Sequence, residues 1–93
     1  MDFEWDPAKA EINLRKHGIA IDFATGVFSD PGRIEQADEV DYDGENREIV
    51  IGRVREFVLF VVYTIRNNRI RMISARRATR REYLEYWNGS ISI

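Results

Sequence analysis

Seven arginines in the last third of the chain are the residues best suited to chemistry. They are Arg66, Arg69, Arg71, Arg76, Arg77, Arg80 and Arg81, and no lysine lies among them. The guanidinium group is a planar fork of donors that matches phosphate geometry and stacks on bases, so this stretch suits a nucleic-acid backbone. The same arginines would also fit a solvated face, or a face paired with the acidic half of the chain. Charge alone leaves both interpretations open.

The side chains needed to cleave RNA without a metal ion are present. The chain has no cysteine and one histidine, His17, which excludes thiolate and multi-histidine metal sites. In such cleavage a base takes the proton of the ribose 2′-OH, cations stabilise the charge on phosphorus, and an acid protonates the leaving 5′-oxygen. His17 and Glu82 could transfer protons. His17 also fits a helix-capping cation beside Gly18, and Glu82 fits a capping-box partner of Thr79.

Three aromatic residues follow the arginines. Tyr83, Tyr86 and Trp87 could stack on RNA bases, as recognition of single-stranded RNA commonly requires. The alternative is that the helix carrying them packs on a sheet through Tyr83 and Trp87, which lie one turn apart. We expect Trp87 to be a packing residue and leave both roles open for the two tyrosines.

Length, composition and charge narrow the class of protein. The 93 residues fit one small domain over residues 1–93. Residues 1–56 hold 14 acidic and 7 basic side chains, whereas residues 57–93 hold 2 acidic and 7 basic ones, and the net charge is −2. The longest apolar run, residues 57–63, is too short to cross a bilayer, and the acidic N-terminus is unlike a secretory signal. We therefore expect a cytoplasmic protein that does not bind membranes.

The N-terminal half predicts two helices. Asp6 followed by proline is a strong helix start, and the first helix should run from Pro7 to about His17 and stop at Gly18. Ala10 and Leu14 should form its core face. A second helix should be capped by Asp22 and end near residues 30–32; its apolar stripe is Phe23, Ala24, Val27 and Phe28.

The rest of the chain predicts a sheet and a last helix. Residues 35–46 are acidic and loop-like, with a turn at Asp43-Gly44. Phe3 and Trp5, just before the first helix, could form a short strand or be packing residues. Strands are expected over residues 48–53, 57–66 and 69–77. The second should be an inner strand, and a tight turn at Asn67-Asn68 should join it to the third. In the third strand, Ile70, Met72 and Ser74 alternate with Arg69, Arg71 and Ile73. The fold class is α+β: two N-terminal helices, an antiparallel three- to four-stranded meander, and a C-terminal helix.

A series of different short motifs extends along nearly the whole chain. They are FEWDPAKA at residues 3–10, KHG at 16–18, FSDP at 28–31, GENR at 44–47, VYT at 62–64, IRMISAR at 70–76 and ATRRE at 78–82, together with Asn13, Arg66 and Tyr86. In this order and spacing the series resembles the BrnT toxins over residues 3 to about 87. The resemblance implies a RelE-like fold and a ribonuclease toxin of a type II toxin–antitoxin system that acts without a cofactor and inhibits translation. It also implies a BrnA-like ribbon-helix-helix antitoxin, through which alone the protein would meet DNA.

The resemblance and the arginine block together suggest roles for individual residues. The resemblance points to Lys9, Asn13, Lys16, His17, Arg66, Arg71, Arg76, Glu82 and Tyr86. We expect Arg66 and Arg76 to stabilise the phosphorane, Glu82 or His17 to transfer a proton, and Tyr86 to assist or stack. The residues expected to contact the RNA backbone are Lys9, Lys16, Arg71, Arg77 and Arg80. No metal ligands are expected.

A different class of function fits the same residues. The chain could be a degenerate toxin without turnover, whose arginine-rich face docks an antitoxin. Salt would separate the two hypotheses, because counterion release weakens RNA binding as salt rises, whereas an interface with an apolar core is less sensitive.

Overall fold

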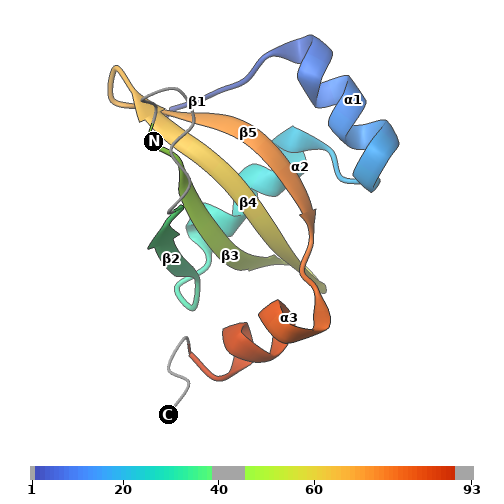
Figure 1. Cartoon of the computed structure of the whole chain (residues 1–93), viewed down its shortest axis with the longest axis vertical. Helices are drawn as coiled ribbons and strands as arrows, with labels where there is room; N and C mark the ends of the chain where they lie inside the picture. Colours follow the sequence, from blue (N-terminus) through green and yellow to red (C-terminus); the bar gives the residue numbers. More distant parts are fainter. Residues whose placement is uncertain (1, 39–45, 90–93) are drawn as a thin grey trace.

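A five-stranded mixed sheet organises the chain (Figure 1). The computed structural model describes residues 2–38 and 46–89. The elements in order are β1 (Phe3–Glu4), α1 (Pro7–His17), α2 (Ile21–Ala24), the 3₁₀ helix η1 (Thr25–Ser29), β2 (Ile34–Ala37), β3 (Glu48–Val54), β4 (Phe57–Arg66), β5 (Arg69–Arg77) and α3 (Arg80–Trp87). The strand order is β1-β5-β4-β3-β2, in which only β1, beside β5, pairs in parallel.

The α+β class is confirmed, and strands β2 to β5 form an antiparallel meander, but the sheet is mixed because β1 adds a fifth strand in parallel. Strand β1 precedes the helices and joins the far edge of the sheet, where Phe3 pairs with Ile70. Strand β2 lies in the stretch expected to be a loop, and it pairs antiparallel with β3. Its sequence, IEQA, lacks the alternation of apolar and polar residues that indicates a strand, and of its four residues only Ile34 is half-buried. The predicted Asp43-Gly44 turn lies outside the described residues.

The two faces of the sheet carry separate apolar clusters. One cluster joins α2 and η1 to the sheet through residues such as Ala24, Val27 and Val61, with Ala10 of α1 packed against it. The other joins α3 to the opposite face through Ile51, Val58 and Tyr86. Helix α3 lies at one end of the sheet, and α1 lies beside β5 toward the other (Figure 1). Among the described residues, α3 contacts β3 and β4.

Helix α1 is confirmed with its caps, but its buried residue differs from the prediction. The Asp6 carboxylate accepts a hydrogen bond from the Ala8 N–H, and Gly18 ends the helix with a φ of 71°. Leu14, expected in the core, is 47% exposed, whereas Asn13 is 6% exposed. The Asn13 amide donates to the carbonyls of Ile19 and Ala75 and accepts from the Ala75 N–H. The Asn13 side chain thus pairs with the backbone at the edge of β5. Because its polar atoms are hydrogen-bonded, this residue can be buried.

The second N-terminal helix is shorter than predicted and is not capped by Asp22. Helix α2 has one turn, starts after Ala20 without a side-chain cap, and passes into η1. Close packing holds η1 against β3. A Cβ built on Gly52 would lie 2.9 Å from the Cβ of Val27, so β3 needs a glycine where η1 crosses it.

Strands β4 and β5 form the predicted hairpin with one irregularity. Strand β4 is the central strand, as expected, and Asn67 and Asn68 form the turn with φ values of 53° and 61°. The register shifts between Val62, which pairs with Ser74, and Tyr63, which pairs with Met72. Ile73 is thus an extra residue, a β-bulge, and the predicted simple alternation in β5 is wrong beyond it.

Helix α3 begins with the predicted capping box but packs through a different aromatic residue. The Thr79 hydroxyl accepts from the Glu82 N–H, and the Glu82 carboxylate accepts from the Thr79 N–H. Tyr86 is 8% exposed, whereas Trp87, the expected packing residue, is 52% exposed. No helix within residues 2–38 and 46–89 is both long and apolar enough to cross a membrane.

Candidate functional site

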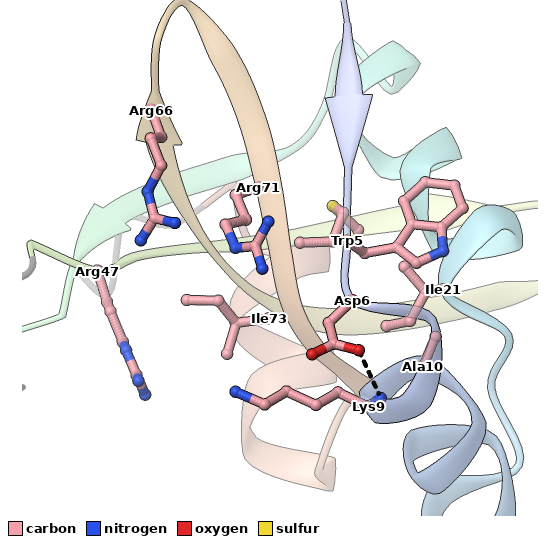
Figure 2. Close-up of a pocket in the computed structure, with 10 residues that line it drawn as sticks. Trp5, Asp6, Lys9, Ala10, Ile21, Arg47, Arg66, Arg71 and Ile73 are labelled. Carbon is pink, nitrogen blue, oxygen red and sulfur yellow. Dashed lines mark hydrogen bonds between the residues drawn. The ribbon is translucent and has the colours of Figure 1, made fainter.

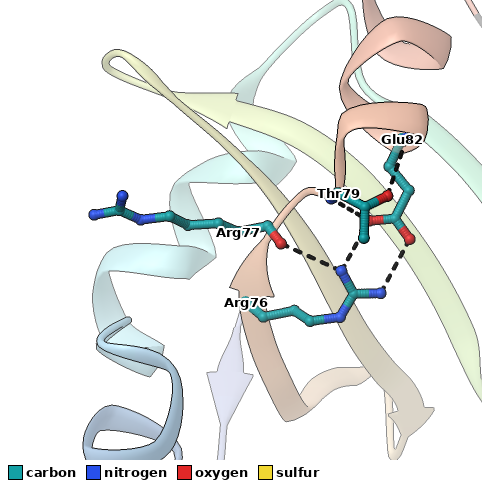
Figure 3. Close-up of polar contacts among 4 residues, drawn as sticks. All are labelled: Arg76, Arg77, Thr79 and Glu82. Carbon is teal, nitrogen blue, oxygen red and sulfur yellow. Dashed lines mark hydrogen bonds and ion pairs between the residues drawn. The ribbon is translucent and has the colours of Figure 1, made fainter.

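Arg76 is held in place at the junction of β5 and α3 (Figure 3). It pairs across the sheet with Phe60 of β4, and its Cζ lies 4.0 Å from the centroid of the Phe60 ring. Its two terminal nitrogens donate to the two carboxylate oxygens of Glu82, at 2.8 and 3.0 Å. This bidentate pair, stacked on an aromatic ring, fixes the plane of the guanidinium.

Glu82 serves both the helix and the arginine. Burial raises the pKa of the Glu82 carboxyl, but the hydrogen bonds from Arg76 and the Thr79 N–H and the charge of Arg76 outweigh it, so the pKa lies below its usual value. Glu82 is therefore ionised at neutral pH, with 17% of its side chain exposed.

The Arg76 guanidinium keeps donors for a ligand. Nη1 also donates to the Arg77 carbonyl at 3.2 Å, which uses both of its hydrogens. The Nε–H and one Nη2 hydrogen have no partner among the described residues, and 34% of the side chain is exposed. A fork of N–H donors with a fixed orientation is suited to two oxygens of one phosphate group.

Tyr86 and Asp30 attach α3 to the loop that follows η1. The Tyr86 hydroxyl donates to Oδ2 of Asp30 at 2.6 Å, and Asp30 also accepts from the Gly32 and Arg53 N–H groups. Burial and the bond to Asp30 raise the pKa of Tyr86 to about 12. Burial raises the pKa of Asp30 too, but the three hydrogen bonds outweigh it and the pKa is lowered. This arrangement explains the burial of Tyr86 by packing and hydrogen bonding.

Four basic side chains surround a cavity at the other end of β5 (Figure 2). The cavity has a volume of about 250 Å³, and its charged lining residues are Asp6, Lys9, Arg47, Arg66 and Arg71. Of the basic lining residues, Lys9, Arg66 and Arg71 were expected from the sequence to act on RNA, and Arg47 was not. Arg47 lies in the acidic half of the chain, and only the GENR motif gave a signal for it.

The structure divides the predicted site residues rather than gathering them. Phe60 and Arg66 are six positions apart on β4, which places Arg66 about 20 Å along the sheet from the partner of Arg76. Lys16 and His17 end α1, which packs with the first apolar cluster, on the face opposite α3. Arg77 points away from Arg76 (Figure 3) and its Cζ lies 4.9 Å from the Phe57 ring. Arg80 is exposed at the first residue of α3.

A comparison with protein families gives the chain its context. The model of the BrnT ribonuclease toxins of type II toxin–antitoxin systems matches residues 5–82. The chain belongs to the BrnT family. The resemblance seen in the sequence motifs is thus confirmed, and with it a ribonuclease toxin of a toxin–antitoxin system, whose class implies an RNA substrate and an antitoxin partner. A search of curated proteins found no match.

For a BrnT toxin, the arrangement of charge at both ends of β5 is the feature to explain. Arg76 stands at the α3 end, and the four basic side chains of the cavity stand at the end near β1. In the described part of the chain, no group of three or more His, Asp and Glu side chains is arranged to hold a metal ion.

Proposed function

We propose that this BrnT toxin is a metal-independent endoribonuclease that cleaves RNA on the open face of the sheet beside Arg76 and thereby inhibits translation. The observation that carries the proposal is the Arg76 guanidinium, oriented by Phe60 and Glu82 with two N–H groups left for a ligand. The resemblance to BrnT toxins further supports a RelE-like architecture and a BrnA-like ribbon-helix-helix antitoxin as the partner.

In this mechanism the substrate supplies the nucleophile. The ribose 2′-oxygen attacks phosphorus, the P–O5′ bond breaks, and a 2′,3′-cyclic phosphate and a 5′-hydroxyl are formed. The free N–H groups of Arg76 donate to the non-bridging oxygens, where negative charge grows in the transition state. Glu82 holds Arg76 in this position and takes up the 2′-OH proton, while water supplies the proton for the leaving 5′-oxygen.

The other predicted residues take supporting places in this proposal. Tyr86 keeps α3 docked, because its hydroxyl is bonded to Asp30 and its raised pKa makes it a weak acid at neutral pH. Arg66 and His17 lie away from Arg76 and do not contact the phosphate that is cleaved.

The test compares RNA cleavage by the wild type and by Arg76→Ala in excess chelator. Removing a donor from the developing oxyanion should lower kcat by about 10²-fold or more. Arg15→Ala is the control, since it removes an exposed arginine of α1 to which no role is assigned, and it should cleave at close to the wild-type rate. Equal losses in the two variants would contradict the assignment of Arg76, and loss of wild-type cleavage in chelator would contradict metal independence.

A second variant separates catalysis from folding. Arg76→Ala leaves Glu82 without its partner, whereas Arg76→Ala with Glu82→Gln removes both charges together. Both should melt as folded proteins and fail to cleave. If the folded wild type binds an antitoxin but neither cleaves RNA nor arrests translation in a cell-free extract, the non-catalytic alternative is correct.

A further inference from the structure

Helix α3 exposes two large aromatic side chains that the packing of the molecule does not use. Of its three aromatic residues Tyr86 is buried, whereas Tyr83 is 45% exposed and Trp87 is 52% exposed. Within residues 2–38 and 46–89, neither exposed ring joins the two apolar clusters of the sheet. Exposed apolar side chains that are scattered singly need no explanation, but contiguous ones mark a binding surface.

The two exposed rings are contiguous and attached to a fixed point. Tyr83 and Trp87 lie one turn apart on α3, with ring centroids 6.1 Å apart and an interplanar angle of 66°. The Tyr86 ring meets the Trp87 ring at 5.0 Å and 81°, and the Tyr86 hydroxyl is bonded to Asp30. The indole is thus oriented before a ligand arrives, which reduces the entropy lost on binding.

A cation from the sheet lies against the same indole. The Arg53 Cζ is 5.7 Å from the centroid of the Trp87 ring, and the Arg53 N–H donates to Asp30 at 2.7 Å. Asp30 therefore bonds both of the residues that flank the indole, Arg53 and Tyr86. Aromatic rings beside arginine are a combination that binds single-stranded nucleic acid, because every base has a π-face that can stack.

The exposed rings lie on the same face of the sheet as Arg76. Arg76 pairs with Phe60 of β4, and Phe60 pairs with Ile51 of β3. Arg53 follows Ile51 by two positions, so its side chain leaves the sheet on this face too. Two strand spacings across and two residues along the sheet place the backbones of Arg53 and Arg76 about 12 Å apart. One short RNA strand therefore reaches both Arg76 and the indole beside Arg53.

Two features favour a nucleobase over an apolar protein surface as the occupant of these rings. The rings lie between Arg53 and the site of Arg76, whose charges suit a polyanion, whereas the core of a protein interface is depleted of charged residues. The substrate class of the family is RNA, whose bases are accessible to aromatic side chains wherever the strand is unpaired.

We propose that Trp87, with Tyr83 beside it, is a base-stacking subsite that binds an unpaired nucleobase of the RNA strand whose phosphate contacts Arg76. The proposal rests on the proposed function and adds a substrate preference to it. The bases of a double helix stack on one another and offer no free face to the indole, so the subsite selects single-stranded RNA. Because stacking tolerates all four bases, this selection is for an unpaired strand rather than for a sequence.

The experiment measures binding of 2′-O-methyl RNA, which cannot be cleaved because its nucleophile is blocked. The ligands are a single-stranded octanucleotide and an abasic strand with the same backbone. Trp87→Ala removes the ring, and Trp87→Phe keeps an aromatic face. The matched control is Leu84→Ala, which removes an apolar side chain of similar exposure, 47%, from the same helix. Thermal melts verify that all three variants fold.

We expect Trp87→Ala to bind the octanucleotide about fivefold or more weakly, the loss typical of one stacked base that loses its aromatic partner. Trp87→Phe should retain most of the affinity, and Leu84→Ala should resemble the wild type. The abasic strand should bind the wild type and Trp87→Ala equally. In a Trp5→Phe background, the octanucleotide should quench the fluorescence of Trp87, and the abasic strand should leave it unchanged.

Three results would overturn the proposal. Equal weakening by Trp87→Ala and Leu84→Ala would mean that any loss of apolar surface from α3 has this effect. Equal weakening of the octanucleotide and the abasic strand by Trp87→Ala would mean that the indole supports α3 and holds no base. An octanucleotide affinity unchanged by Trp87→Ala, with loss of antitoxin binding, would assign the rings to the protein partner; without that loss it would leave them no ligand.

The result is separable from the test of Arg76. Binding of an uncleavable strand needs no catalysis, so binding that depends on Trp87 alongside an inactive wild type would remove the catalytic proposal and leave the subsite. Cleavage that depends on Arg76, with octanucleotide binding untouched by Trp87→Ala, would remove only the subsite.

Discussion

At the scale of single residues, one carboxylate links helix capping to the candidate catalytic arginine. Glu82 accepts from the Thr79 N–H and from both terminal nitrogens of Arg76. Glu82 caps the start of α3 through the Thr79 N–H, and it also orients the Arg76 guanidinium. The structure makes both contacts with the same side chain, so the capping and positioning hypotheses for Glu82 are compatible.

Substituting Glu82→Gln separates its proton transfer from its positioning role. Glutamine keeps the shape and one acceptor oxygen but loses the charge, so Arg76 stays near its place without a base beside it. We expect kcat to fall while KM changes little, and the acidic limb of the pH–rate profile to disappear. Retention of that limb in the variant would show that another group takes the proton.

Tyr86→Phe tests the bond that docks α3. The variant removes the hydroxyl from Asp30 and should lower the free energy of unfolding by about 1.5–3 kcal/mol, the range for hydrogen bonds to charged groups. Chemical denaturation measures the loss. A double-mutant cycle with Asp30→Asn should show strong coupling, and simple additivity would mean that the bond contributes nothing.

At the scale of elements, α3 is held by one apolar anchor and several polar contacts. The anchor is Tyr86 against Ile51 and Val58. The polar contacts include the bonds of Glu82 to Arg76 and of Tyr86 to Asp30, and the guanidinium of Arg53 lies over the Trp87 ring. A helix of eight residues is not stable alone, so its position depends on these groups. Because Arg76 is oriented by the same helix, docking of α3 and order at the candidate site are coupled.

The docking of α3 should therefore depend on pH. Glu82 and Asp30 have lowered pKa values in the folded state, so their stabilisation is present above the ordinary carboxyl pKa and is lost as the pH falls through the folded values. Tyr86 has a raised pKa of about 12, so its contribution is lost as the pH rises from the ordinary tyrosine value of 10.0 toward 12.

Trp87 fluorescence in a Trp5→Phe background reports this helix, since the chain has two tryptophans and Trp87 contacts the Tyr86 ring. We expect a plateau at intermediate pH with a transition on each side. A signal unchanged through both limbs while the far-UV spectrum stays folded would contradict the role of these ionisations.

The crossing of η1 over β3 gives a second test at this scale. A Cβ at Gly52 would lie 2.9 Å from the Val27 Cβ and 3.1 Å from its carbonyl oxygen, so Gly52→Ala must move backbone and should cost about 1–3 kcal/mol. Gly32→Ala is the control, because its nearest contact is 3.4 Å away, at a side-chain oxygen. Equal melting temperatures for the two variants would show that η1 shifts freely.

At the scale of the whole molecule, the net charge conceals how charge is distributed. The chain carries −2 overall, yet Arg76 and the four basic cavity residues lie toward the two ends of β5. RNA binding by such a protein depends on local charge and on release of counterions rather than on net charge.

Salt dependence tests this view. If single-stranded RNA contacts Arg76 and two or three other basic residues, log K for binding should fall with log salt at a slope of about −2 to −3. A titration of wild type with the uncleavable octanucleotide at several salt concentrations measures it. A flat dependence between low and physiological salt would contradict binding through the phosphate backbone.

The sequence alone determined the features that depend on near neighbours in the chain. The caps at Asp6 and Gly18, the asparagine turn, the limits of β4 and β5 and the capping box of α3 were all predicted, because each depends on residues within a few positions of one another. The arginine block and the family motifs were equally local, and they led to the correct family.

Only the tertiary structure decided which distant residues meet. A strand of two residues pairs with β5 across 67 positions of sequence, Asn13 is buried because β5 offers it hydrogen bonds, and Arg47 joins Lys9 at a cavity although it lies in the acidic half. It also placed Tyr86 rather than Trp87 in the core and separated Arg66 from Arg76. The physical reason is the same throughout: strand pairing, register and burial are set by contacts between segments far apart in the chain, which local patterns do not encode.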